Sequence, residues 1–399
     1  MITLEEARAK IDEAVKSLPP VRLPILKTVG CVLTADIRSP INVPDFDCSI
    51  VDGIALRYDD LNGVGPWRMP IQSIIAAGDA GSEKLLPGYA VKIMTGAPLP
   101  PGADTVMKIE DISIENDRTV IGNKTSKGEY VRARGDDVKE GEVLFEKGTV
   151  MTAVDVGVLA SIGLVEVEVI PHPRIALLST GSEIIAPGEK LKQGRRYDAN
   201  SFVLKSMFGG NSFPVDLIAD IIPDRTEQLE TIIKNCLDKY DLLITSGGVS
   251  MGDFDYIPDV VKKLDGEILF HKVKIKPGKP VLVAKIRNCW LVGLPGNPVS
   301  VITGYHLFVK RIIARMMATP YRPRSTHARM ADNVTFNGTR FGLLGARLEE
   351  SSEGVIAYPV KGQNSGRLSS VKGINGFIML EVGKTSVISG ETVYAEWLY

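Results

Sequence analysis

The sequence carries almost no net charge. Its 47 lysine and arginine residues are balanced by 48 aspartate and glutamate residues, which leaves a formal charge of −1 at pH 7. Proteins that hold nucleic acid or an anionic membrane by bulk electrostatics need a large positive excess. The composition therefore predicts no nucleic-acid partner and no membrane partner, and any anion site has to be built locally.

Long apolar runs are also missing. The first twenty residues contain no apolar core of a signal peptide, and no stretch approaches the length of a membrane span. The default expectation is therefore a cytoplasmic protein. With 399 residues, of which 44% are hydrophobic and 24% charged, the chain resembles an ordinary soluble protein of about two to four domains.

Cysteine and histidine are scarce and scattered. The cysteines show no CxxC spacing, which indicates reduced thiols and neither a disulfide framework nor a zinc site. They are Cys31, Cys48, Cys236 and Cys289. The four histidines do not cluster either, and His306, within a helical pattern, is better explained as an ordinary core or surface residue than as a metal ligand.

Three short apolar runs in the middle of the chain share one pattern. Residues 174–179, 242–244 and 290–294 each have the character of a buried strand that stops at a turn of small residues. Helical patterns lie between and after these runs, at 201–208, 226–239, 256–264 and 299–308. This alternation predicts a mostly parallel, doubly wound α/β domain, whose ligands bind outside the carboxyl ends of the strands.

The three turns should therefore lie together on one edge of the sheet. They are Thr180-Gly181-Ser182-Glu183, Ser246-Gly247-Gly248 and Pro295-Gly296-Asn297-Pro298. In the last turn Asn297 is expected as the N-cap of a helix and Pro298 as its first residue.

The glycine pair has two interpretations. Gly247 and Gly248 could leave backbone N–H groups open to a phosphate, with Asp253 and Asp255 holding a divalent cation beside it. The same residues would also suit a plain connection with two solvated aspartates. Lys272, Lys274 and Lys276 would share one face of a strand, at intervals of about 7 Å, and either form a solvated stripe or meet an anion.

The regions on either side of this segment are different in character. Thr3 and Glu6 form a capping box before a helical pattern, and a second helix is expected at 152–163. Between them, residues 60–148 contain short alternating runs, which predict a β domain inserted within a first domain. Short strands return after Arg322 in a C-terminal β domain, whose loop 362–367 could face a neighbouring subunit.

Several polar residues outside the central segment have both a functional and a structural interpretation. Asp52 precedes Gly53, where a substrate could approach closely, but this stretch could equally be an acidic turn before a strand. Thr95 and Asp137 lie in turns of the β region, and Asp224 stands where a helix cap is expected. Turn formation for Thr95 and Asp137, and capping for Asp224, are the commoner explanations.

Taken together, the motifs resemble a known family. FDCSIVDGIA, IMTGAPLPPGADTV, ARGDD, LLSTGSEI, ITSGGVSMGDFDY, IKPGKP and LPGNPVS occur in the order seen in molybdopterin molybdenumtransferases, the family of MoeA and the gephyrin E domain. The resemblance covers nearly the whole chain. It implies a multidomain α/β plus β protein with a discontinuous N-terminal dimerisation domain (1–42 and 148–170) and an inserted β-rich domain (43–147). A central molybdopterin-binding domain (171–324) and a C-terminal β-barrel-like domain (325–399) would follow.

The resemblance also implies an activity in molybdenum cofactor biosynthesis. Family members insert molybdate into adenylylated molybdopterin and release AMP, with Mg²⁺ or a similar cation, in a homodimer that shares its active site between subunits. A molybdopterin adenylyltransferase would act upstream as a partner. Two alternative functions remain for this chain. It could itself be a molybdopterin adenylyltransferase, or it could be a non-catalytic molybdopterin-binding scaffold. The sequence does not distinguish molybdate from tungstate.

The residue roles implied by the resemblance agree with the candidates above. Asp52 matches the catalytic aspartate and, with Asp253 and Asp255, would hold the metal. The implied substrate-binding residues are Thr95, Asp137, Glu183, Asp224, Gly247, Gly248, Ser250, Lys272, Lys276, Lys279, Pro295 and Pro298. Two positions depart from the family pattern, because Cys48 replaces the usual Asn and Ile54 the usual Tyr; cysteine is the poorer hydrogen-bonding group.

Overall fold

The computed structural model describes residues 1–209, 213, 215–217, 222, 226–249 and 256–399. The chain divides into two compact units. The first contains residues 1–22, 30–32 and 168–399, and the second contains residues 23–29 and 33–167. A three-stranded sheet in the order β1 (Val21–Pro24), β13 (Glu166–Ile170), β2 (Val32–Leu33) is formed where the chain passes from one unit to the other.

The first unit is built on a six-stranded sheet. Its order is β17 (Val215–Leu217), β14 (Ile175–Ser179), β18 (Leu242–Ser246), β22 (Cys289–Leu294), β21 (Leu282–Ile286) and β19 (Glu267–His271). The first four strands are parallel, whereas β21 runs antiparallel to both of its neighbours. The predicted mostly parallel sheet is therefore confirmed.

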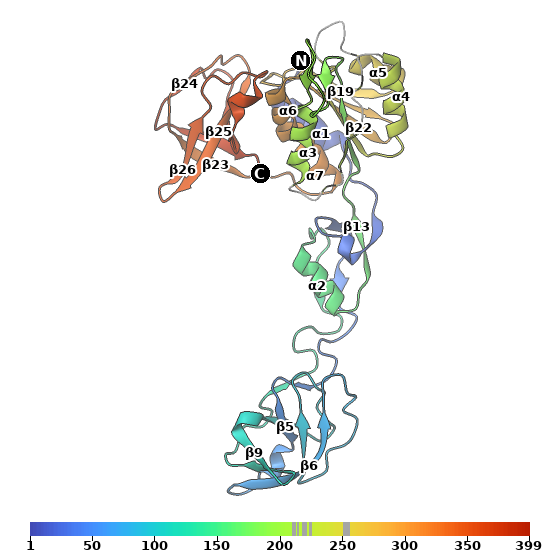
Figure 1. Ribbon diagram of the computed structural model, residues 1–399, viewed down its shortest axis with the longest axis vertical. Helices are drawn as coiled ribbons and strands as arrows, with labels where there is room; N and C mark the ends of the chain where they lie inside the picture. The colour runs from blue at the N-terminus through green and yellow to red at the C-terminus, as the bar shows by residue number, and fades with distance from the viewer. Residues whose placement is uncertain (210–212, 214, 218–221, 223–225, 250–255) are drawn as a thin grey trace. The chain divides into compact units, whose positions relative to one another are not determined.

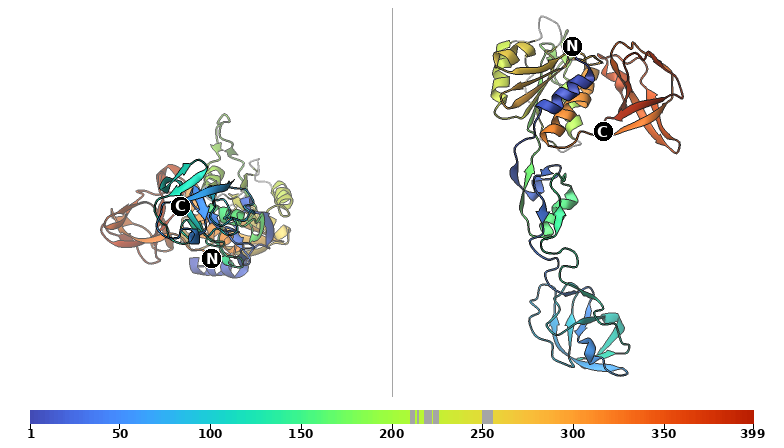
Figure 2. Two further views of the ribbon diagram at one scale, coloured as in Figure 1. Left: turned by 90° about the horizontal axis from the view of Figure 1, so that it is seen from below. Right: turned by 180° about the vertical axis from the view of Figure 1, so that it is seen from behind.

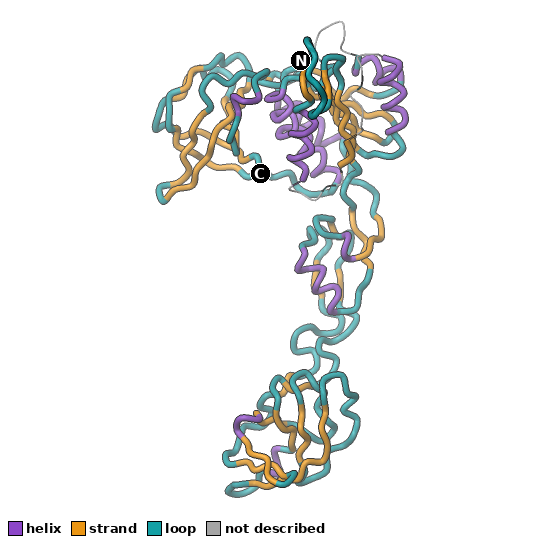
Figure 3. The backbone as a smooth tube through the Cα atoms, viewed as in Figure 1, coloured by secondary structure: helices purple, strands orange, loops and turns teal. Residues whose placement is uncertain are grey.

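Helices cover both faces of this sheet (Figure 3). Ile175 and Leu177 pack into one core with helices α1 (Leu4–Ala14), α3 (Asn200–Gly209), α6 (Pro298–Gly304) and α7 (Lys310–Met316). The alternate residues Ala176 and Leu178 pack into a second core with α4 (Thr226–Cys236) and α5 (Ile257–Lys263). Because successive side chains of a strand point to opposite faces, burial of all five residues of β14 requires this double cover.

The N-terminal helix belongs to this core. The predicted capping box is present, since the Thr3 N–H donates to Glu6 Oε2 (2.7 Å) and the Glu6 N–H donates to Thr3 Oγ1 (3.1 Å). Leu4, Ala7 and Ile11 are buried against the central sheet. Helix α1 thus lies in the first unit, although the sequence grouped it with residues 148–170. The predicted four-domain boundaries stay a prediction.

The C-terminal part of the first unit forms a closed barrel (Figure 1). Five strands follow one another in the order β25 (Phe341–Ser351), β26 (Gly354–Pro359), β23 (Ser325–Met330), β29 (Thr392–Trp397) and β27 (Gly376–Leu380), and β27 pairs again with β25. The short strand β20 (Ile275–Lys276) extends from the central domain and pairs with β25. Two further short strands, β24 (Val334–Thr335) and β28 (Ser386–Val387), pair with each other.

The second unit is mainly β-structure, as expected for residues 60–148. Its larger sheet has the order β8 (Thr105–Lys108), β5 (Gly53–Leu56), β7 (Ala90–Ile93), β6 (Trp67–Ile75), β10 (Arg118–Ile121) and β9 (Ile112–Glu115). Two short pairs join β4 (Cys48–Ser49) to β11 (Val131–Arg132) and β3 (Ile37–Arg38) to β12 (Val143–Phe145). The predicted second helix is α2 (Ala153–Ser161). No helix in the described part of the chain is long and apolar enough to cross a membrane.

A buried hydrogen bond between a histidine and a glutamate fastens the barrel to the helices. His306 lies in a π-helical turn (Tyr305–Val309) between α6 and α7, and its Nε2 is 2.7 Å from Oε2 of Glu396 on β29. The two residues are 0% and 2% exposed. Lys310 donates from Nζ to the Leu398 carbonyl beside this pair (3.2 Å), and Arg8 Nη2 lies 4.0 Å from Glu396 Oε1.

Replacement of His306 by alanine should destabilise the protein by about 3 kcal/mol, because it leaves the Glu396 carboxylate buried without its imidazole partner. Urea unfolding of the His306→Ala variant measures this loss. Arg329→Ala provides the control, since Arg329 and its partner Glu353 are 52% and 72% exposed and an exposed pair contributes below about 1 kcal/mol. Equal effects of the two substitutions would contradict the assignment.

The pair should also make stability depend on pH. Burial holds the pKa of His306 below its usual value and outweighs the attraction of Glu396 for the protonated ring. As pH falls through about 6.5, the unfolded chain takes up a proton at His306 that the folded chain does not, so the folded state loses stability. Between pH 7.5 and 5.5, wild type should lose about 1 kcal/mol more than His306→Gln in urea unfolding. A difference that stays constant with pH would refute this.

Candidate anion-binding site

The three predicted turns do lie on one edge of the central sheet. In the strand register Ser179 pairs with Ser246, and Ser246 pairs with Leu294, so β14, β18 and β22 end level with one another. From β14 the chain passes first to β17, which lies on one side of β14, and then to β18, which lies on the other side of β14. Such a reversal of strand order opens a crevice at the carboxyl ends of the strands, where ligands of α/β proteins bind.

The glycine pair is required by packing. Gly247 and Gly248 have φ angles of +105° and +70°. A Cβ on Gly247 would lie 2.6 Å from Thr180 Oγ1 and 2.8 Å from the Thr180 carbonyl oxygen. The Gly247 N–H donates to the Leu294 carbonyl (2.9 Å), so the prediction that it is open to an anion is wrong. The glycine instead lets two neighbouring turns approach each other.

Asn200 at the start of α3 connects two of the turns. Its Nδ2 donates to Ser246 Oγ (2.7 Å) and to the Gly296 carbonyl (2.8 Å). The buried carboxylate of Asp198 accepts hydrogen bonds from the hydroxyls of Ser179 and Ser201. Neither Asp198 nor Asn200 was a candidate from the sequence. The only feature of the sequence that could have indicated a role for them is their position between a polar loop and a predicted helix.

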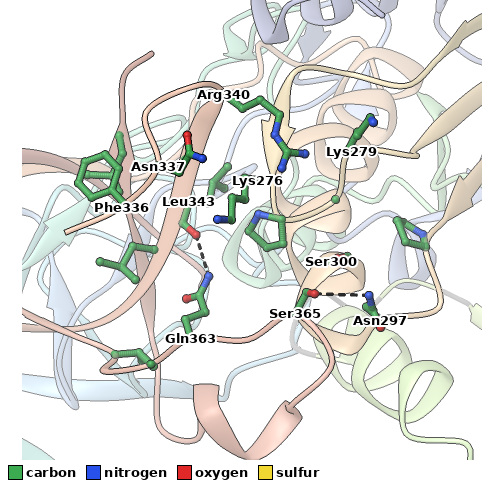
Figure 4. A pocket seen from close by; sticks show the side chains of 18 of the residues that line it. Lys276, Lys279, Asn297, Ser300, Phe336, Asn337, Arg340, Leu343, Gln363 and Ser365 are labelled. Carbon is green, nitrogen blue, oxygen red and sulfur yellow. Dashed lines mark hydrogen bonds between the residues drawn. The ribbon is translucent and has the colours of Figure 1, made fainter. Parts of the chain in front are cut away.

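A pocket of about 780 Å³ opens beside the turn after β22 and is closed on its other side by the barrel (Figure 4). The predicted residues Glu183, Lys276, Lys279 and Pro295 line it, and Gln363 and Ser365 reach it from the barrel loop 362–367. Pro298 is not part of the lining and opens helix α6. Asn297 is the N-cap residue of that helix, as predicted, but its side chain makes no capping hydrogen bond, and its Nδ2 donates to Ser365 Oγ (3.4 Å).

The pocket is strongly cationic. Among the described residues that line it, four are basic and one, Glu183, is acidic. The basic residues are Arg196, Lys276, Lys279 and Arg340. None of them forms an ion pair within 4.0 Å in the part of the chain that the structure describes. Unpaired cations gathered in one concave site attract an anion.

The predicted lysine stripe is only partly correct. Strand β19 ends at His271 and β20 begins at Ile275, and Lys272 between them has a left-handed φ of +73°. Residues 272–276 are therefore not one strand, and Lys272 does not line the pocket. Arg340, which the sequence did not single out, takes a place beside Lys276, because Ile275 and Lys276 pair with Phe341 and Gly342.

Asp52 lies in the second unit and is held by Thr95. The Thr95 N–H (2.7 Å) and Oγ–H (2.8 Å) both donate to Asp52 Oδ1. These bonds, together with the charge of Lys92, hold the pKa of the exposed Asp52 carboxyl below its usual value. Gly53 is needed for the pairing of β5 with β8, because a Cβ there would lie 1.8 Å from the Met107 carbonyl oxygen.

The acidic loops near Asp52 are paired with arginines. Arg132 Nε donates to Asp136 Oδ2 (3.1 Å), and Asp137 lies 3.9 Å from Arg132 Nη2. Cys48 pairs with Arg132 across β4 and β11, is 6% exposed, and has a pKa raised by burial. It therefore packs as a small apolar residue where the resembling family has an amide.

The described residues supply one suitable ligand for a magnesium ion, the carboxylate of Asp52, and no complete ligand set. No group of three or more His, Cys, Asp or Glu residues that could hold a metal occurs among them. Mg²⁺ is commonly bound by one or two carboxylates together with substrate phosphates, a role that the ionised Asp52 suits. The remaining predicted residues Asp224, Ser250, Asp253 and Asp255 lie outside the described residues.

Comparisons with known proteins agree along the whole chain. Residues 2–163 match the MoeA N-terminal region (domain I and II), residues 176–315 a probable molybdopterin-binding domain, and residues 327–398 the MoeA C-terminal region (domain IV). The chain is 34% identical to molybdopterin molybdenumtransferase from Haemophilus influenzae, covering 99% of this chain and 98% of the relative. It is 32% identical to the Staphylococcus aureus enzyme of the same name over 98% of this chain and 94% of the relative.

Solved structures show the same similarity. A molybdopterin biosynthesis MoeA protein from Pyrococcus horikoshii superposes with a TM-score of 0.83 at 30% identity, covering 100% of this chain and 99% of the other. A second structure of a MoeA protein from this organism gives a TM-score of 0.73 at 26% identity, with both chains fully covered.

Replacement of Gly247 by alanine should cost about 3 kcal/mol or more in the free energy of unfolding, because the new Cβ collides with Thr180 in addition to straining the backbone. Gly354→Ala is the matched control, since Gly354 has a φ of +109° and nothing within 4 Å of an added Cβ. That variant should lose only about 1 kcal/mol. If urea unfolding gives equal losses, the close approach of the turns is not what requires glycine.

Proposed function

Since the chain belongs to the molybdopterin molybdenumtransferase family, we propose that it inserts molybdate into adenylylated molybdopterin and releases AMP. It is a transferase of molybdenum cofactor biosynthesis. The observation that carries the specific reaction is the cationic pocket, in which Lys276, Lys279 and Arg340 meet with no acidic partner among the described residues. Molybdate is a tetrahedral dianion, and such a pocket suits its charge.

The phosphoanhydride bond of the substrate is broken by addition of water, which leaves AMP and the pterin phosphate. Negative charge grows on both products as this bond breaks. Lysine and arginine side chains that are already in place stabilise that charge without reorganising, which is the largest contribution in many enzymes. The pocket cations would act in this way on the oxyanion and the phosphates.

Asp52 is proposed as the catalytic carboxylate. Its lowered pKa keeps it ionised at neutral pH, and Thr95 engages Oδ1. Oδ2 accepts no hydrogen bond from the described residues, so it can face a ligand. A bound Mg²⁺ or similar cation would supply neutralising charge at the phosphates, and Asp52 would hold it.

We also propose that the protein is a cytoplasmic homodimer. Asp52 and the pocket belong to different compact units of the chain, which is compatible with a homodimer whose active site is shared between two copies. A molybdopterin adenylyltransferase would supply the activated substrate. All four cysteines are free thiols, which supports the reducing cytoplasm as the location.

The Asp52→Asn variant should release AMP at least about 100-fold more slowly than wild type from adenylylated molybdopterin, molybdate and Mg²⁺, since removing one preorganised electrostatic group costs a factor of this size. Asp59→Asn is the control, because Asp59 is also exposed in the same unit and lies outside the site. It should turn over normally. Wild-type turnover by a folded Asp52→Asn variant would end the assignment of Asp52.

A further inference from the structure

A basic loop projects from the first unit next to the pocket. It connects two short parallel strands, β15 (Ile184–Ile185) and β16 (Arg196–Tyr197), and appears in green in the left view of Figure 2. Every residue from 187 to 197 is exposed. The loop carries Lys190, Lys192, Arg195 and Arg196 against the single acid Glu189, and these cations form no ion pair within the described residues.

Only one of these cations belongs to the pocket. Arg196 lines it, whereas the adjacent Arg195 does not. The backbone of Arg196 is held in place, because its N–H donates to the Glu183 carbonyl (2.8 Å). Just after the strand, the Asp198 N–H donates to the Ile185 carbonyl (2.9 Å). Asp198 is buried and anchors this end of the loop. Arg196 is thus presented from a fixed position.

The other pocket cations form a separate group. Lys276 and Arg340 are neighbours through the pairing of β20 with β25, and Lys279 follows three residues later. Figure 4 shows these three side chains around the same part of the pocket. Arg196 comes from a different element about eighty residues earlier in the chain. The lining therefore contains a cluster of three cations and one further cation that enters from the basic loop.

Size and charge indicate room for a second anionic group. A volume of about 780 Å³ is that of a site for a whole cofactor-sized ligand and greatly exceeds the needs of one tetrahedral oxyanion. Four cations and Glu183 give the described part of the lining a net charge of +3, whereas an oxyanion supplies −2. The carboxylate of Glu183 is turned towards its own loop, since a Cβ on Gly181 would lie 2.9 Å from its Oε2.

We propose that Arg196 forms a second anion subsite, which binds the phosphate of the nucleotide part of the substrate, while Lys276, Lys279 and Arg340 hold the oxyanion. This assignment rests on the proposed function, because it takes AMP as the released group. A guanidinium suits a phosphate, since its planar donors form two parallel hydrogen bonds with phosphate oxygens. The exposed Lys190, Lys192 and Arg195 raise the local concentration of anions but make no contact in the pocket.

The test compares two neighbouring arginines in the full-length protein. AMP and molybdate binding are each measured by calorimetry for wild type, Arg196→Gln and Arg195→Gln. Both substitutions remove one charge from the same exposed loop, so both should leave the thermal unfolding temperature unchanged. Arg196→Gln should weaken AMP binding about tenfold, the effect of losing one charge-assisted contact, and change molybdate binding less than about twofold. Arg195→Gln should change both affinities less than about twofold.

Equal weakening of AMP binding by the two variants would assign the effect to general loop charge and overturn the subsite. Equal weakening of AMP and molybdate binding by Arg196→Gln would mean one shared anion site and would also overturn it. Unchanged AMP binding in Arg196→Gln refutes the role of Arg196 alone. Wild-type protein that binds neither AMP nor molybdate would refute the proposed function itself.

Discussion

Positive charge without an acidic partner is the constraint on which the functional site depends. Several arginines near the surface of this chain are neutralised by a neighbour, as Arg132 is by Asp136 and Arg174 by Asp241. Lys276, Lys279, Arg196 and Arg340 have no ion-pair partner among the described residues, and they differ from the other unpaired cations in that they line one pocket. Like charges held together in a concave site repel one another, and a bound anion relieves that repulsion. The net charge of the chain, −1, gives no hint of this local excess.

The fold brings these cations together through elements that have other structural tasks. Parallel strands β14, β18 and β22 end level, and Gly247 allows their turns to pack closely enough for Asn200 to connect them. The pairing of β20 with β25 then carries the barrel, and with it Arg340, to the side of Lys276. His306 and Glu396 fasten the same barrel to the helices. The shape of the pocket is therefore tied to the stability of the contact between sheet and barrel.

Sequence reasoning located the features that depend on local pattern. Buried strands, the capping box at Thr3 and the turns after β14, β18 and β22 were predicted because hydrophobic periodicity and small residues specify them directly. Residues whose role depends on long-range pairing were missed, as Arg340 reaches the pocket only through β25, and Arg196 only through its bridge to Ile184. The prediction of one extended strand through Lys272 was wrong, because this residue adopts a left-handed φ. The glycines at 53 and 247 were correctly singled out, but they serve backbone packing instead of ligand access.

The most direct test of the account is the position of a bound oxyanion. Tungstate has the charge and shape of molybdate and scatters anomalously, so a crystal of the full-length protein soaked with tungstate locates it without ambiguity. The account predicts an anomalous peak in the pocket, in contact with Lys276, Lys279 and Arg340. A fully occupied peak at the Gly247 turn or on the second unit, with the pocket empty, would contradict it.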